Sequence, residues 1–262
     1  MTFLRTRLLW VLALALLAAR VASACGVVSE RETAAVRVTA DAPSGVRIAF
    51  LGHASFLIES PAHVTAVTDY NGVNIPPSPP DIATMNHAHA THYTDQPDPR
   101  IAHVLRGWTD DGGPARIMLT VRDMMVRNIP TSIRNYMTGQ DELYGNSIFI
   151  FETGGLCIAH LSHLHHTLTA DDLATMGPID VLMVPVDGIF TMNQQDMADV
   201  IAEVHPSVVL PMHYFGGAVL ERFLALIRDR YEIRRNAASA ITLSRESLPG
   251  RPTVIVLGRG TD

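Results

Sequence analysis

Histidine-rich segments that follow apolar runs are the feature that most restricts how this chain can fold. The segment His87-Ala-His-Ala-Thr-His92 places three imidazoles within six residues. Further histidines come directly after apolar runs, at 160–166 and at position 213. Loops that leave the ends of several buried strands meet at one edge of a sheet. Imidazole suits zinc and other borderline metals. The sequence therefore predicts an α/β protein with a metal site at a sheet edge, whereas isolated His63, His103 and His205 are read as structural or solvent-facing.

Hydrophobic patterning predicts strands first and a strand–helix alternation later. Strands are expected at 46–51, 55–59, 64–69, 101–106, 116–127, 147–152, 156–160, 181–186 and 207–211, and helices at 169–176, 193–204 and 217–230. The run 181–186 is continuously apolar, which is typical of a strand covered on both faces. Segment 71–80 is rich in proline and predicts a loop at the rim of the site. No repeat or break in composition divides the chain, so one domain is expected.

Several collinear motifs resemble those of one known superfamily. They are Phe50–Glu59 (FLGHASFLIE), Thr68-Asp69, the His87–His92 loop, Cys157–His163, Ile179–Pro185 and Pro211–Tyr214. Together they resemble the metallo-β-lactamase fold superfamily, in particular the branch with ascorbate-6-phosphate lactonase and many zinc-dependent hydrolases. The resemblance implies a four-layer αββα sandwich for residues 25–262 and a zinc-dependent hydrolytic activity.

The chain departs from the superfamily pattern at three expected ligands. Thr91 stands where the family loop His-x-His-x-Asp-His has its aspartate, and His163 stands where the metal-bridging aspartate is usual. The region that normally supplies another histidine, 129–134, contains none. The resemblance and these departures leave five imidazoles as the expected metal ligands: His87, His89, His92, His163 and His213.

An all-imidazole shell has chemical consequences. A carboxylate can bridge two metals, whereas a neutral imidazole has one free lone pair, so His163 at the bridging position favours one ion over two. Nitrogen ligands suit zinc and disfavour magnesium and calcium. By resemblance, Asp69 is expected beneath the metal loop, where it would orient a ligand imidazole; the alternative is an aspartate that begins a turn. His53 and Thr91 are expected near the pocket, and a buried loop histidine bonded to backbone is the alternative for His53.

Two function classes remain open on this evidence. The first is a hydrolase whose metal activates water against a small ester, lactone, amide or phosphodiester. The second is a non-catalytic member of the fold that binds a metal or a ligand in a degenerate site. The retained histidines favour the first class, and the missing carboxylates favour the second.

The N-terminus predicts export. Arg5 and Arg7 precede the apolar run 8–19, and Ala22-Ser23-Ala24 forms an A-x-A cleavage site, the pattern of a signal peptide over residues 1–24. Twelve apolar residues are too few to span a bilayer, which needs ~20. A periplasmic or secreted protein is expected, with a lipid anchor if Cys25 is acylated.

Charge argues against nucleic acid as a partner. Without the signal segment the chain has 17 basic and 26 acidic residues, and nonspecific nucleic-acid binding rests on neutralising phosphates. A small-molecule substrate is expected instead. Arg134 is considered as a local contact for a phosphorylated substrate, with a solvated loop charge as the alternative.

Overall fold

Side chains of the long strands alternate between two apolar cores, so these strands pack in layers. The structure, a computed structural model, describes residues 45–135 and 138–258, so the expected signal peptide and Cys25 lie outside the described residues. In strand β8 (Asp141–Thr153), Ile148 and Ile150 face one core while Phe149 and Phe151 face another. Because neighbouring side chains on a strand point to opposite faces, this strand is buried on both sides.

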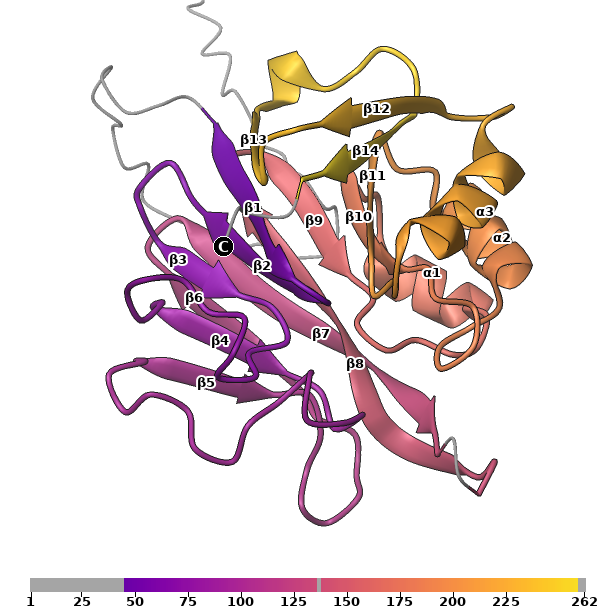
Figure 1. Cartoon of the computed structure of the whole chain (residues 1–262). Helices are drawn as coiled ribbons and strands as arrows, with labels where there is room; N and C mark the ends of the chain where they lie inside the picture. Colours follow the sequence, from indigo (N-terminus) through magenta and orange to yellow (C-terminus); the bar gives the residue numbers. More distant parts are fainter. Residues whose placement is uncertain (1–44, 136–137, 259–262) are drawn as a thin grey trace, which may run out of the picture.

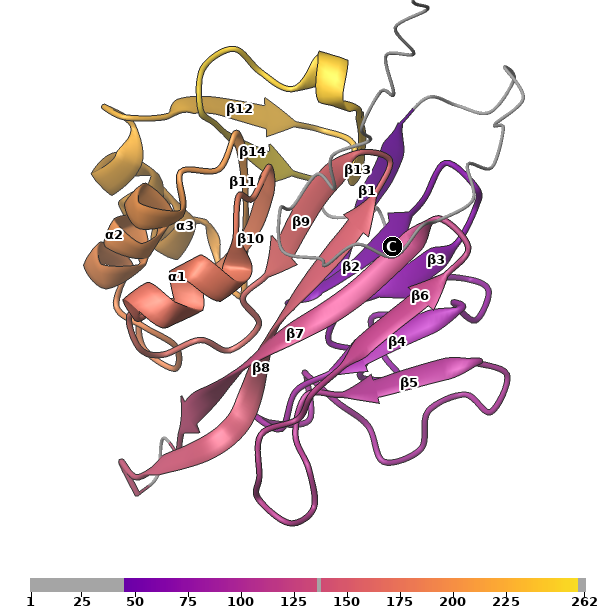
Figure 2. The same cartoon turned by 180° about the vertical axis from the view of Figure 1, so that it is seen from behind.

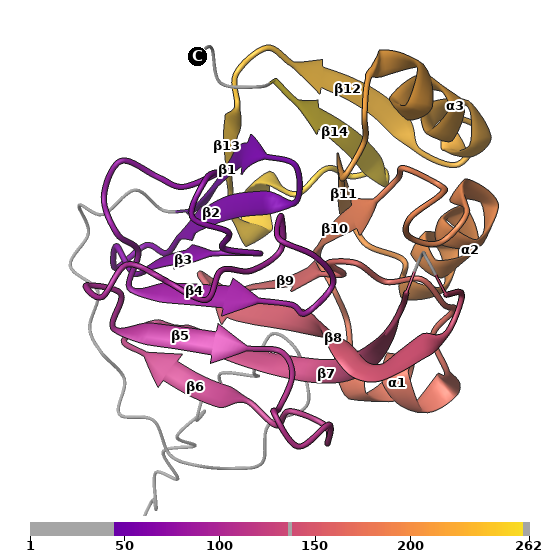
Figure 3. The same ribbon diagram turned by 60° about the horizontal axis from the view of Figure 1, so that its bottom comes forward.

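Two sheets form the body of the molecule (Figures 1 and 3). The six-stranded sheet has the order β13-β1-β2-β3-β4-β5, with β1 Val46–Gly52, β2 Ser55–Glu59, β3 Thr65–Val67, β4 Ile82–Met85, β5 His103–Arg106 and β13 Ala240–Leu243. The eight-stranded sheet has the order β12-β14-β11-β10-β9-β8-β7-β6, with β6 Met118–Val121, β7 Met124–Arg134, β9 Leu156–His160, β10 Val181–Pro185, β11 Val208–Met212, β12 Glu232–Asn236 and β14 Thr253–Leu257.

Helices α1 (Ala170–Met176), α2 (Gln194–Val204) and α3 (Gly217–Ile227) gather on one side of the molecule, beside β9–β11 (Figures 1 and 2). Thr169 begins α1 with a capping box to Asp172, and the side chain of Asn193 caps α2. Such caps satisfy backbone N–H groups that have no partner within a helix. The apolar faces of the helices join the outer core of the eight-stranded sheet.

The predicted fold class is confirmed in its two sheets and its helical layer, with one difference. A central core lies between the sheets, where Phe56 of β2 and Phe149 of β8 belong to the same cluster. The outer face of the six-stranded sheet is covered, in the described part of the chain, by loop residues such as Tyr70, Tyr93 and Trp108 rather than by a helix. None of the described helices is long and apolar enough to cross a membrane.

Strand boundaries differ from expectation in two places. The segment expected as one strand at 116–127 is a hairpin, because Arg122 takes a left-handed backbone conformation between β6 and β7. The strand expected at 147–152 is longer, since β8 pairs with β7 along a hairpin that projects from the body of the molecule (Figure 1). Strands β4, β12, β13 and β14 are additional to the prediction.

The topology brings distant segments to one edge. Strands β3 and β4 run parallel, and so do β9, β10 and β11. Parallel strands end at the same side of their sheet, and loops that follow them meet there. The loops after these strands, together with the turn between β1 and β2, hold the histidines singled out by the sequence.

Candidate metal centre

Imidazoles from four separate segments converge at this edge. One donor atom from each of His53, His89, His92 and His213 lies within 4.8 Å of the others. His163 adjoins them, with its ring centroid 5.0 Å from those of His89 and His92 and 5.2 Å from that of His213. Four of the five imidazoles predicted as ligands are therefore brought together, and His53, predicted as a pocket residue, belongs to the group.

Asp69 fixes the orientation of His92 from beneath the cluster. Its Oδ2 atom accepts a hydrogen bond from Nδ1 of His92 at 2.6 Å. Ser162 Oγ lies 2.8 Å from both carboxylate oxygens, and Asn86 Nδ2 donates to Oδ1 at 3.0 Å. A carboxylate only accepts hydrogen bonds, so Nδ1 of His92 carries the proton and the lone pair is on Nε2. The placement of Asp69 agrees with the expectation of an acid beneath the metal loop.

Asp187 holds His213 in the same way. Its Oδ1 atom lies 3.1 Å from Nδ1 of His213 and also accepts from the hydroxyl of Thr191. Its Oδ2 atom accepts the backbone N–H groups of Ile189 and Phe190 at 2.9 and 2.6 Å. One carboxylate therefore orients a cluster imidazole and organises the turn that follows β10.

The remaining two cluster residues are held by neutral groups. Thr91 Oγ1 lies 2.8 Å from Nδ1 of His89, so the residue at the family's aspartate position orients a neighbouring imidazole. The carbonyl of His53 accepts the backbone N–H of His213 at 2.8 Å. His160 is fully buried, and its Nε2 donates a hydrogen bond to the carbonyl of Ala54 at 2.8 Å. This bond stabilises the turn that contains His53.

The backbone is strained at this edge of the sheets. Eight described non-glycine residues have a positive φ angle, and four of them belong to the site: His53 (52°), Asp69 (44°), Ser162 (51°) and His213 (53°). The left-handed conformation costs a residue with a Cβ about 1–2 kcal/mol. Strain of this kind gathers at binding and catalytic sites, where the surrounding contacts enforce it.

Burial lowers the pKa of four imidazoles at the site. Desolvation, reinforced by the neighbouring histidines, lowers the pKa of His53 to about 3, of His89 to about 4 and of His163 to about 2. Burial also lowers the pKa of His92, against the opposing effect of Asp69. Burial alone raises the pKa of Asp69, but His92 and Asn86 together hold it below the usual value. At neutral pH the site therefore offers unprotonated imidazoles, the form that binds metals.

Unsatisfied nitrogen atoms show that the residues fit a metal ion. Nε2 of His53, His92 and His213 is buried without a hydrogen-bond partner among the described residues, and both ring nitrogens of His163 are as well. Burying a polar atom without a partner is costly. Lone pairs aimed at one another across a few ångströms suit a cation that accepts nitrogen ligands. The donor set favours zinc or another transition metal over magnesium or calcium.

The structure does not bring His87 into this group, although the sequence predicted it as a ligand. Its Nδ1 atom lies 2.7 Å from Oε1 of Glu142, and its ring stacks on Trp108 with centroids 5.1 Å apart. Tyr93 adds a third ring at 5.4 Å. Aromatic packing and the carboxylate hold the imidazole among residues of the neighbouring loops, so its place in the cluster is taken by His53.

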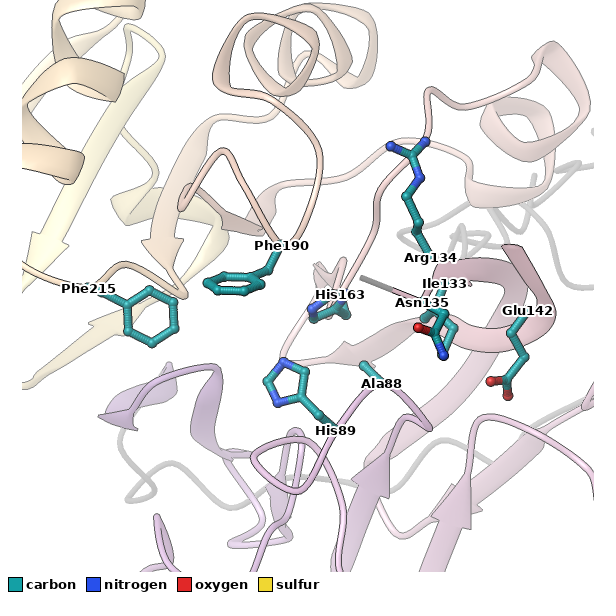
Figure 4. Close-up of a pocket in the computed structure, with 9 residues that line it drawn as sticks. All are labelled: Ala88, His89, Ile133, Arg134, Asn135, Glu142, His163, Phe190 and Phe215. Carbon is teal, nitrogen blue, oxygen red and sulfur yellow. The ribbon is translucent and has the colours of Figure 1, made fainter. Parts of the chain in front are cut away.

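A cavity of about 370 Å³ opens beside the cluster (Figure 4). His89 and His163 point into it, with Phe190 and Phe215 on one side and Ile133, Arg134, Asn135 and Glu142 on the other. Arg134 ends β7, and its Nε lies 3.7 Å from Oδ1 of Asp141. The pocket is large enough for a small ligand.

Sequence reasoning missed Asp187 and the two phenylalanines. Asp187 follows the apolar strand β10 at the same sheet edge as His213, a position that marks it as a candidate. Phe190 and Phe215 each come two or three residues after a site residue, and both are exposed. No motif marks Ser162, whose hydroxyl contacts both oxygens of Asp69.

Relatives of this chain are named metal-dependent hydrolases. A UPF0173 metal-dependent hydrolase of Carboxydothermus hydrogenoformans is 25% identical over 71% of this chain and 92% of its own length. One from Thermococcus kodakarensis is 26% identical over 72% of this chain and 95% of its own length.

A crystal structure from Thermotoga maritima, assigned as a zinc-dependent hydrolase of the metallo-β-lactamase superfamily, superposes with a TM-score of 0.60. It is 26% identical and covers 81% of this chain and 99% of its own. A family model described as a β-lactamase superfamily domain matches residues 47–213, the segment from β1 to His213. The chain therefore belongs to the β-lactamase superfamily, in its metallo-β-lactamase fold.

Proposed function

We propose that the protein is a hydrolase that uses one zinc ion, held by His53, His89, His92 and His213, to cleave a small ester, lactone, amide or phosphodiester. The observation that carries this proposal is that the buried Nε2 atoms of His53, His92 and His213 have no hydrogen-bond partner in the described part of the chain, and that these residues cluster with His89 at the strand ends. Relatives named as metal-dependent hydrolases over most of their length support the reaction class.

The carboxylates at the site support one ion rather than two. Both oxygens of Asp69 accept hydrogen bonds, from His92, Ser162 and Asn86. Both oxygens of Asp187 are occupied by His213, Thr191 and backbone N–H groups. Neither group has an oxygen left to bridge two metals, and the other candidate, position 163, holds a histidine.

A bound zinc ion polarises the attacked bond and lowers the pKa of water to about 7. The chain supplies the rest. Asp69 and Asp187 keep His92 and His213 in the tautomer with a free Nε2. His163 is 4% exposed and lines the cavity, where a neutral imidazole offers one donor and one acceptor to the substrate. We therefore assign His163 to the substrate side rather than to the metal. Replacing His163 by alanine distinguishes this role from the predicted role as a metal ligand.

The reaction is tested by comparing zinc-loaded and metal-stripped protein on a panel of esters, lactones, amides and phosphodiesters. Turnover that appears only with metal, and that His92→Ala abolishes, supports the hydrolase. Stable zinc binding without turnover of any class would instead support the non-catalytic alternative, a metal-binding member of the fold.

Export belongs to the proposal as well. The basic, apolar and A-x-A segments of residues 1–24 support a signal peptide that is removed before the folded domain. Mass spectrometry of the mature N-terminus is the direct measurement. A start at Cys25 with attached acyl chains supports a membrane anchor, an unmodified start at Cys25 or Gly26 supports a periplasmic or secreted protein, and an intact Met1 contradicts export.

A further inference from the structure

We infer that the site takes uncharged esters or lactones that carry an aromatic ring or a similarly flat apolar group next to the scissile bond. This inference rests on the proposed hydrolytic function and narrows its substrate class. In the reaction, water cleaves the acyl C–O bond, so that the acyl carbon gains the hydroxyl and the alkoxide oxygen gains the proton.

Two phenylalanines form an apolar wall beside the metal-binding histidines. Phe190 and Phe215 are 39% and 59% exposed, and their rings meet edge to face with centroids 5.9 Å apart. The ring of Phe215 lies 5.6 Å from both His53 and His213. Adjacent exposed apolar side chains that line a pocket are typical of a binding surface, unlike scattered ones. A flat ring packed on this wall places its neighbouring atoms next to the cluster (Figure 4).

The wall is held in place by a site residue. Asp187 accepts the backbone N–H of Phe190 at 2.6 Å through Oδ2 and binds Nδ1 of His213 through Oδ1. Phe215 follows His213 by two residues. The carboxylate that orients a metal ligand thus also holds the backbone of Phe190, and Phe215 lies two residues beyond that ligand, so the wall is positioned next to the reacting bond.

The charged side chains on the side of the cavity opposite the two phenylalanines favour an uncharged substrate. Among the described residues that line this cavity, only Arg134 and Glu142 carry ordinary charges, and they have opposite signs. Asp141 lies 3.7 Å from the guanidinium of Arg134. A phosphoryl group normally meets several donors or a bidentate arginine. Arg134 alone does not supply enough donors for a phosphoryl group, because it lies beside the carboxylate of Asp141 and across from that of Glu142. Ile133 and Ala88 extend the apolar lining of the cavity.

Matched substrates test the inference on the zinc-loaded protein. Benzyl acetate and ethyl acetate have leaving alcohols of similar acidity, so their ratio of kcat/KM reports recognition of the ring rather than intrinsic reactivity. We expect a preference for the benzyl ester of about tenfold, equivalent to about 1.4 kcal/mol. The 4-carboxylate of benzyl acetate should lose most of that preference. Phe215→Ala should reduce the benzyl-to-ethyl ratio towards one.

Leu226→Ala is the matched control, because Leu226 is 43% exposed on α3 and does not line the cavity. The inference is overturned if benzyl and ethyl acetate react equally, if the charged ester is preferred, or if Phe215→Ala leaves the ratio unchanged. If the zinc-loaded protein hydrolyses none of the esters, lactones, amides and phosphodiesters of the panel, calorimetric titration with N-benzylacetamide and N-ethylacetamide tests the ring site separately. If the benzyl amide binds more tightly and Phe215→Ala removes that difference, the ring site stands although the proposed hydrolysis has failed. Equal binding of the two amides rejects the ring site as well as the proposed hydrolysis.

Discussion

Oδ2 of Asp69 lies 2.6 Å from Nδ1 of His92, and neither side chain has any exposed surface. This pair joins the turn after β3 to the loop after β4, and Ser162 connects it to the loop after β9. A buried carboxylate in contact with an imidazole is strongly stabilised in its charged form when further donors surround it. The pair therefore links the six-stranded and eight-stranded sheets directly beneath the metal-binding nitrogens.

Asp69→Asn should weaken metal binding without preventing folding. The amide adds a donor that faces Ser162 and Asn86, and the tautomer of His92 is no longer enforced. Loss of such a supporting group typically lowers metal affinity by about 10–100-fold, measurable by competition with a chelator of known affinity. Asp199→Asn is the control, since Asp199 is exposed on α2 and accepts only from Gln195 among the described hydrogen bonds. Equal affinities in the two variants would contradict the supporting role of Asp69.

His163→Ala separates a substrate-facing imidazole from a ligand. With His163 on the substrate side, the variant keeps its zinc while turnover falls by about tenfold, the loss expected from one hydrogen bond to the substrate of about 1.4 kcal/mol. Loss of zinc along with activity shows instead that His163 is a ligand. His163→Asp is a second test of the ligand role, because a carboxylate at position 163 can bind a further metal ion. Zinc content by elemental analysis and initial rates on the same samples give both answers.

His87→Ala should leave metal content unchanged. The imidazole is 40% exposed, and its contacts are Glu142, Trp108 and Tyr93 rather than the cluster. Only a small loss of stability is expected, within about 1 kcal/mol. Elemental analysis and thermal unfolding check both points, with His89→Ala as the comparison that does lose metal. A His87→Ala protein that purifies without zinc would restore the ligand role that the sequence suggested.

Metal-free protein should lose stability as the pH falls from about 6.5 towards 4. Burial, with repulsion from neighbouring imidazoles, lowers the pKa of His53 to about 3 and of His89 to about 4. Over this range the unfolded chain binds protons at these positions and the native chain does not, so the free energy of unfolding decreases as the pH falls. Above about pH 7.5 neither state is protonated there to a significant extent, and this contribution levels off.

Urea unfolding of the metal-stripped protein at pH 7.5 and 5.0 measures this effect. Replacing His53 and His89 by glutamine, which does not titrate, should make the difference between the two pH values smaller. A metal-free protein that is equally stable at both values is incompatible with neutral, buried imidazoles in the native state.

The sheets and helices were predictable where the hydrophobic pattern is strong. Strand β10 is a continuous apolar run, and α2 repeats buried residues at helical spacing. Strand β12, with the sequence EIRRN, is largely exposed and pairs with β14 at a sheet edge, so its pattern does not distinguish it from a loop. The four-residue β4 is too short to show a period and sits between a proline-rich segment and the histidine loop.

The composition of the site was predictable, but its geometry was not. Motifs identified His89, His92, His163 and His213 because their spacing and positions after strands are local properties. The exchange of His87 for His53 depends on where Trp108 and Glu142 lie, and both are distant in sequence. The role of Asp187 depends likewise on the parallel pairing of β10 with β11, which places it beside His213.

The zinc content of the purified mature protein measures the central claim most directly. Wild-type protein, stripped of metal and titrated with zinc, should bind one ion per chain tightly, and His92→Ala and His213→Ala should each abolish tight binding. His205→Ala, at an exposed position at the end of α2, should bind as the wild type does. A ratio near two contradicts the single-ion site, and absence of tight binding in the wild type contradicts the metal centre itself.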